Sequence, residues 1–212
     1  MVSYENISVK FNNNYIIKDL NLNIEKNDKI VIAGKSGIGK TTLFHLLLGF
    51  VVPCKGRILF DGKCISQKNI WDIRKHFAYI SQDINIGKGK VIDIISEYFS
   101  LKANSEIQFS SDERKKLFNK FFLSEELLQK DIDELSGGER QRISIIISIM
   151  LKRVFFLLDE ATSALDAKLK KIVIDYFMAK KNSTVIAISH DKLWHNNKNV
   201  KIFNLENKKW VH

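Results

Sequence analysis

The chain of 212 residues lacks the features of membrane-spanning and secreted proteins. Its longest uncharged apolar run, residues 143–151, is about half of the roughly 20 residues that a transmembrane helix needs. Residues 1–6 do not show the basic start and apolar run of a secretory signal. Cys54 and Cys64 are too few for a disulfide framework or a zinc site. We therefore expect a cytosolic chain with reduced thiols that does not cross a membrane by itself.

Proline and glycine are also scarce, with one and ten residues, and the sequence shows neither a low-complexity linker nor an internal repeat. These absences predict one domain over residues 1–212. Acidic residues are outnumbered, and the net charge is +10. Of the 34 basic residues, however, 28 are lysines spread along the chain, whereas base reading and bidentate phosphate contacts rely on arginine. We interpret most of this charge as solvated surface, and expect no specific nucleic acid as a partner.

Short apolar runs that end in polar or glycine residues are the main structural signal. They lie at residues 30–33, 77–80, 154–158 and 184–188. Such runs are typical of strands that are buried on both faces of a parallel sheet. Helical patterns lie between them, at residues 41–48, 139–151 and 167–181. This alternation predicts an α/β domain with a mostly parallel sheet.

Two further segments depart from that alternation. Residues 84–153 show helical patterns with little strand signal, which predicts a helical subdomain between two core segments, residues 1–83 and 154–212. The first 30 residues and residues 56–62 contain short alternating runs, which predict an antiparallel sheet beside the core. In open parallel sheets, ligands bind beyond the carboxyl ends of the strands, so the polar residues there are the candidates for chemistry.

A glycine-rich loop follows the first of these strands. It reads Gly34-Lys35-Ser36-Gly37-Ile38-Gly39-Lys40-Thr41, which matches G-x-x-x-x-G-K-[ST] between a strand and a helix. Its backbone N–H groups and the helix start can bind phosphate oxygens. Lys40 can reach the β- and γ-phosphates, and the Thr41 hydroxyl can bind Mg²⁺. We expect this loop, with Thr42 after it, to bind a nucleoside triphosphate.

Polar residues also follow the other three strands. Asp159 and Glu160 close one of them, where the first carboxylate can hold a metal and the second can orient water. Gln82 and His190 follow the remaining two, and each can hydrogen-bond a γ-phosphate or the attacking water. A histidine at a strand end is more often structural than catalytic. Gln82 and His190 therefore indicate a phosphate site only when other motifs accompany them.

The sequence Leu135-Ser136-Gly137-Gly138-Glu139-Arg140-Gln141 precedes a helical pattern. Ser136 and Glu139 have the spacing of a capping box, which would start any helix. A capping box needs no second glycine, however. Ser136, Gly137 and Gly138 in front of a helix can also form a second anion site from backbone N–H groups and a hydroxyl.

Together these motifs resemble the nucleotide-binding domain of ABC transporters over essentially the whole chain. Residues 34–41 resemble its Walker A motif, residues 154–160 its Walker B motif with the catalytic glutamate, and residues 135–141 its signature. Gln82 matches the Q-loop, residues 163–166 the D-loop and His190 the H-switch. The resemblance implies a P-loop NTPase (RecA-like) core, an N-terminal antiparallel β subdomain and an ATPase that uses ATP and Mg²⁺.

The resemblance also implies how the motifs work together. Two such domains stack head to tail, and each ATP lies between one subunit's phosphate loop and the other's Ser136, Gly137 and Gly138. Thr41, Gln82 and Asp159 would surround Mg²⁺. Glu160 would polarise the attacking water, and His190 would contact the γ-phosphate together with Lys40.

Two positions keep alternative interpretations. Asp166 would lie at the dimer seam, but it is equally placed to cap a helix from Ala167. An aromatic residue of the N-terminal sheet is expected to stack on adenine, and Phe11 is preferred over Tyr15 because it stands where the family has tyrosine.

The resemblance extends to partners and location. Residues 129–134 lack the stretch that exporters with fused membrane domains carry, which predicts a separate ATPase subunit. Its partners would be an integral membrane transporter protein and a second nucleotide-binding subunit, at the inner face of the cell membrane. One alternative is a soluble ABC ATPase that acts on nucleic acid or ribosomes, as the net charge allows. Another is a regulatory subunit with degenerate catalysis, which the intact Asp159, Glu160 and His190 argue against.

Overall fold

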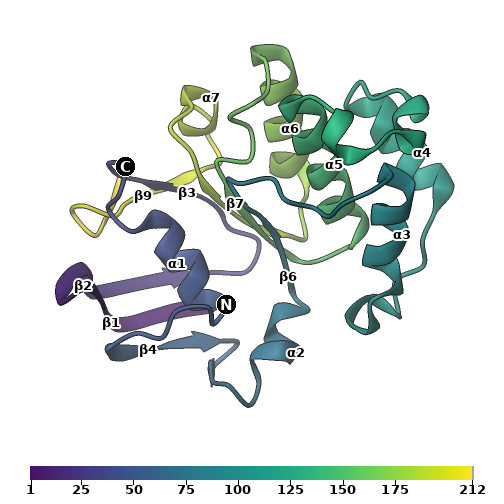
Figure 1. The fold of residues 1–212 in the computed structure, drawn as a ribbon. Coiled ribbons are helices and arrows are strands. Elements are labelled where there is room, and N and C mark those ends of the chain that lie inside the picture. Colours follow the sequence, from purple (N-terminus) through teal and green to yellow (C-terminus); the bar gives the residue numbers. More distant parts are fainter. Residues whose placement is uncertain (212) are drawn as a thin grey trace.

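Two β-sheets and the helices that cover them make up the fold in the computed structural model, which describes residues 1–211 (Figure 1). The core sheet has the order β10-β9-β3-β8-β7-β6. Five of its strands are parallel, and β10 pairs antiparallel with β9. Its strands are β3 (Lys29–Ala33), β6 (Phe77–Ile80), β7 (Phe155–Asp159), β8 (Thr184–Ile188), β9 (Lys201–Asn204) and β10 (Lys209–Val211). This sheet confirms the predicted α/β class.

The second sheet is antiparallel and comes mainly from the N-terminal part of the chain. It has the order β2-β1-β4-β5. Its strands are β1 (Val2–Phe11), β2 (Asn14–Ile24), β4 (Lys55–Phe60) and β5 (Lys63–Cys64). Apolar residues alternate along β1 and β2, so that one face of this sheet packs into the interior with α1 (Lys40–Leu47). Helix α1 thus lies between the two sheets, as Figure 1 shows.

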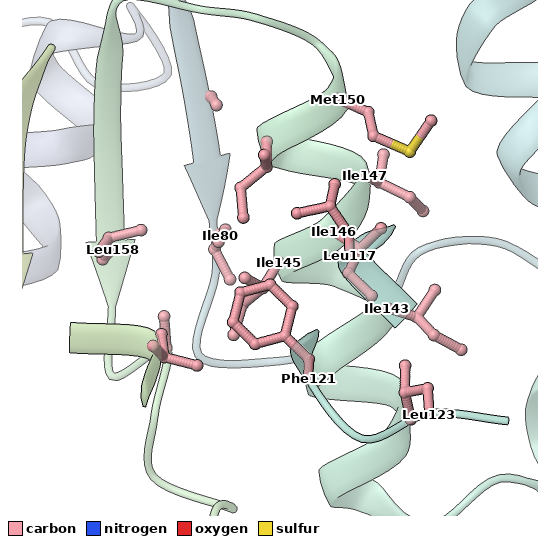
Figure 2. Packing of buried hydrophobic residues seen from close by; sticks show 14 of the residues in the cluster. Ile80, Leu117, Phe121, Leu123, Ile143, Ile145, Ile146, Ile147, Met150 and Leu158 are labelled. Carbon is pink, nitrogen blue, oxygen red and sulfur yellow. The ribbon is translucent and has the colours of Figure 1, made fainter. Parts of the chain in front are cut away.

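Helices cover the other face of the core sheet (Figure 1). They are α3 (Val91–Ser100), α4 (Ser111–Lys120), α5 (Gly137–Met150) and α6 (Ala167–Ala179), with short 3₁₀ turns η1 (Lys102–Asn104), η2 (Glu125–Gln129) and η3 (Ile132–Glu134). From Ile143 onward, helix α5 is apolar almost all round and is therefore buried. Its Ile146 and Ile147 belong to the same buried hydrophobic cluster as Phe121, Ile80 and Leu158, and Figure 2 shows Ile146 pointing toward the strands.

The structure corrects several boundaries. Strand β7 begins at Phe155 and includes Asp159, because its pairing with β8 runs from Phe155 to Asp159. Val154 lies outside the strand and is exposed. Within the predicted helical subdomain, residues 125–129 form a 3₁₀ turn. Helices α2 (Ile70–Arg74) and α7 (Lys192–His195) and strands β9 and β10 were not expected. Within residues 1–211, no helix is both long enough and apolar enough to cross a bilayer.

We predict that Gly56→Ala destabilises the fold more than Gly62→Ala does. Both glycines have positive φ, of 86° and 78°, which costs an alanine about 1–2 kcal/mol. A Cβ at Gly56 would also lie 2.3 Å from the carbonyl oxygen of Glu5, whereas a Cβ at Gly62 meets no atom of the described chain within 4 Å. We expect urea unfolding to show a loss of about 1 kcal/mol for Gly62→Ala and roughly 2 kcal/mol or more for Gly56→Ala. Equal losses would contradict the backbone clash.

Candidate active site

A cavity of about 590 Å³ lies at the carboxyl ends of the core strands, where polar residues were expected. The predicted site residues that line it are Phe11, Ser36, Gly37, Gly39, Lys40, Thr41, Thr42, Gln82, Asp159, Glu160 and His190. The fold therefore brings four separate motifs, which come after four different strands, to one place.

The phosphate loop leads from β3 into α1. Gly34, Gly37 and Gly39 have φ values of 147°, 78° and 101°, which glycine adopts without a Cβ penalty. Gly39 is the N-cap of α1 and has no side chain to cap the helix, so the first N–H groups of α1 are available to a ligand. Lys40 is nearly buried, and its Nζ donates to the carbonyl oxygens of Gly34 at 2.8 Å and Lys35 at 2.9 Å.

Asp159 carries the most constrained charge of the site. Its side chain is 1% exposed at the end of β7, and Oδ2 accepts a long, 3.5 Å hydrogen bond from the hydroxyl of Tyr79. Oδ1 is buried and has no hydrogen-bond partner among residues 1–211. Burial raises the pKa of Asp159, and the hydrogen bond from Thr41 is the main opposing effect.

An orphaned carboxylate oxygen beside a hydroxyl suits Mg²⁺, which takes oxygen ligands and is usually held by one or two carboxylates together with substrate phosphates. In the described part of the chain, no three His, Cys, Asp or Glu side chains gather into a metal site. Asp159, Thr41 and Gln82 thus fit a cation that a bound triphosphate helps to hold.

Glu160 follows Asp159 and is only partly buried. Its φ of 48° places it in the left-handed region, and its N–H donates to the carbonyl oxygen of Ile188 at 3.0 Å. Its Oε1 lies 3.8 Å from Nε2 of His190, which in turn lies 3.4 Å from Nζ of Lys40. Burial raises the pKa of Glu160, with the nearby His190 opposing that rise. A raised pKa makes a carboxylate a better general base.

The Ser136–Gly138 segment lies elsewhere. Ser136 is the N-cap of α5, where its Oγ accepts from the N–H of Glu139 at 3.2 Å and its own N–H donates to Oε2 of Glu139 at 2.8 Å. The capping box is therefore confirmed. Ser136, Gly137 and Gly138 are not among the residues that line the cavity of the described chain. A phosphate bound at Ser136–Gly138 would therefore not be one that lies in the cavity of the same protomer.

The structure also describes the surroundings of the two candidate adenine-stacking residues, Phe11 and Tyr15, and of Asp166. Phe11 lies at the cavity wall with Ile16, whereas the ring of Tyr15 is covered by the ammonium groups of Lys10 and Lys18, 4.4 and 5.6 Å from its centroid. Asp166 is the N-cap of α6, because its Oδ1 accepts from the N–H of Leu169 at 2.9 Å.

Sequence reasoning missed several residues at this site. Glu206, in the turn between β9 and β10, accepts from the N–H of Lys35 at 2.9 Å and so supports the phosphate loop. Tyr79 supports Asp159, and Ser163 lines the cavity. Of these residues, only Ser163 could have been proposed from the sequence, because it begins the stretch that resembles the D-loop.

Comparisons with known proteins point to one family. The family model described as ABC transporter matches residues 17–163. An ergothioneine transport ATP-binding protein of Helicobacter pylori is 34% identical over 91% of this chain and 91% of that protein. An energy-coupling factor transporter ATP-binding protein of Aster yellows witches'-broom phytoplasma is 29% identical over 90% of this chain and 70% of that protein.

Among solved structures, a dimeric ATP-binding cassette in a post-hydrolysis state bound to ADP and Pi has the same fold. Its TM-score is 0.83 at 22% identity, and the match covers 100% of this chain and 98% of the other.

We predict that Asp159→Asn stabilises the nucleotide-free protein at pH 7, because it removes a buried charge whose Oδ1 has no partner within residues 1–211. A gain of about 1 kcal/mol would raise Tm by roughly 2–4 °C. Since the pKa of Asp159 is raised in the folded state, wild type gains stability relative to the variant as pH falls from 7 toward about 4.

Thermal unfolding followed by circular dichroism across this pH range measures the difference. Asp166→Asn is the matched control, because asparagine also caps helices and Asp166 is exposed. A difference between Asp159→Asn and wild type that does not change with pH would contradict the prediction.

Proposed function

This chain belongs to the ABC transporter family, and we propose that it is the ATP-hydrolysing subunit of a transporter whose membrane-spanning part is a separate protein. Membership makes it an ATPase coupled to transport. The observation that most directly supports this proposed function is that the phosphate loop, Asp159, Glu160 and His190 line one and the same cavity.

The proposed division of roles follows from the chemistry of the side chains. The loop N–H groups and Lys40 bind the phosphates, and Phe11 stacks on the base. Mg²⁺ held by Asp159, Thr41 and Gln82 would neutralise charge on the phosphates. Glu160, with its raised pKa, accepts a proton from the attacking water, while His190 is placed to hydrogen-bond the γ-phosphate.

A second copy of the chain is the proposed partner at the nucleotide. Ser136 and Gly137 are exposed at the N-terminus of α5, where backbone N–H groups favour an anion. They are not among the described residues that line the cavity of their own chain. In a head-to-tail dimer, they would instead face the triphosphate that the other protomer binds. Each triphosphate would then lie between the phosphate loop of one protomer and Ser136–Gly138 of the other, with Asp166 at the seam.

The surface beside α1 and α2 supports docking to a membrane protein. Phe50, Val52 and Trp71 are 60%, 78% and 72% exposed, although they are large and apolar. The guanidinium of Arg74 lies 4.7 Å from the ring centroid of Phe50 and 4.6 Å from that of Trp71. Exposed apolar groups gathered in this way are typical of protein interfaces. We therefore place the subunit at the inner face of a membrane, with this surface against its partner.

We predict that Lys40→Ala weakens ATP binding about 10-fold to 100-fold, because a charge-assisted hydrogen bond to phosphate is lost. Isothermal titration calorimetry with ATP and Mg²⁺ measures the affinity. The control is Lys35→Ala, since the Lys35 side chain is 86% exposed and 4.0 Å from Glu206. We expect that control to bind as wild type does. Unchanged affinity in Lys40→Ala would contradict the role of the loop.

We predict that Glu160→Gln binds ATP normally, hydrolyses it about 10²-fold to 10⁴-fold more slowly and accumulates as a dimer. Light scattering after size exclusion with ATP and Mg²⁺ measures the dimer, and phosphate release measures the rate. Adding Gly137→Asp should abolish the dimer but not ATP binding. The new carboxylate has room within the described structure, and it suits a helix N-terminus but repels a triphosphate. A monomeric ATP complex of Glu160→Gln would overturn the proposed dimer.

A further inference from the structure

Gln141 is a completely buried carboxamide in α5 that contacts the segment after the catalytic carboxylate. Its Nε2 donates to the carbonyl oxygen of Glu160 at 3.3 Å, and its Oε1 accepts from the N–H of Ala164 at 3.0 Å. The two partners fix the orientation of the amide, since a carbonyl requires a donor and an N–H requires an acceptor.

The segment that Gln141 holds, residues 160–165, is a tight turn. The N–H of Ser163 donates to the carbonyl oxygen of Glu160 at 3.0 Å, and the N–H of Leu165 donates to that of Thr162 at 3.2 Å. Glu160 itself has a φ of 48°, a conformation that persists in a side-chain-bearing residue only when its surroundings hold it. Ser163, in the same turn, lines the active-site cavity.

The first turn of α5 packs directly on this segment. A Cβ at Gly138 would lie 3.1 Å from the carbonyl oxygen of Ala164, so the backbones approach closely there. Gly138 and Gln141 are three residues apart and share one face of the helix. The start of α5 and the 160–165 turn are thus joined by one close contact and two hydrogen bonds of Gln141.

We propose that Gln141 is a positioning residue for ATP hydrolysis, which sets the backbone of Glu160 and of the 160–165 turn relative to α5. A primary amide of this length supplies the donor and the acceptor together. The inference rests on the proposed function. In the proposed dimer, α5 begins with Ser136–Gly138 at one triphosphate, so Gln141 links that end to the Glu160 that acts on the other triphosphate.

The test compares Gln141→Met with wild type. Methionine is unbranched and of similar size, and it removes both hydrogen bonds. We expect kcat at saturating ATP to fall roughly 10-fold to 100-fold, because small misplacements of a catalytic group have effects of this size. ATP affinity measured by calorimetry should stay within about twofold, since the phosphate loop is untouched. Hydrogen exchange of residues 160–165 should become at least about tenfold faster.

Ser148→Ala is the matched control. Ser148 is a buried polar residue of the same helix, and its Oγ bonds only to the carbonyl oxygen of Ser144 within the described structure. This variant should keep the kcat and the exchange rates of wild type. If Gln141→Met does not fold, Gln141→Asn takes its place. Asparagine keeps the amide but is one methylene too short to span both partners, and its kcat should fall about tenfold.

Wild-type kcat in a folded Gln141 variant, or unchanged exchange at residues 160–165, would overturn the inference. So would a loss of ATP affinity as large as the loss in kcat, since that would indicate a purely structural role. Failure of the proposed function looks different, because wild type itself would then not hydrolyse ATP, whereas the exchange measurement needs no nucleotide.

Discussion

The burial of one carboxylate, Asp159, is the constraint on which the site depends. It ends β7, which lies between β6 and β8, so water is excluded from most of its surface. The surrounding protein supplies a weak tyrosine contact and a threonine hydroxyl, and leaves one oxygen with no partner within residues 1–211. Such an arrangement is unfavourable for the fold alone, and the proposed cation and phosphates would offset that cost.

Much of the core could be predicted from local patterns. The runs at 30–33, 77–80 and 184–188 are strands because continuous apolar residues must be buried on both sides. The carboxyl ends of parallel strands share one edge, so Gln82 and Asp159 had to come near the phosphate loop. The capping box at Ser136 was also predictable from a local pattern, because its partner, Glu139, is only three residues away.

The remaining features depend on distant contacts that no local pattern encodes. β9 and β10 are short and carry lysines, and they are strands only because β9 pairs with the edge of β3 and β10 pairs with β9. Glu206 looks like an ordinary polar residue, and Gln141 is only the last residue of the stretch that resembles the signature. The roles of both arise from backbone groups 171 and up to 23 residues away along the chain. Val154 was assigned to a strand by its apolar side chain, but pairing with β8 begins one residue later.

The position of β3 also bears on how the protein is made. This strand leads into the phosphate loop, yet its two neighbours in the sheet are β8 and β9, which are synthesised more than 150 residues later. Until those strands leave the ribosome, β3 has both backbone edges open and an apolar sequence. A nascent chain in that state is prone to aggregation, so chaperones that shield emerging hydrophobic segments would protect β3 for most of translation.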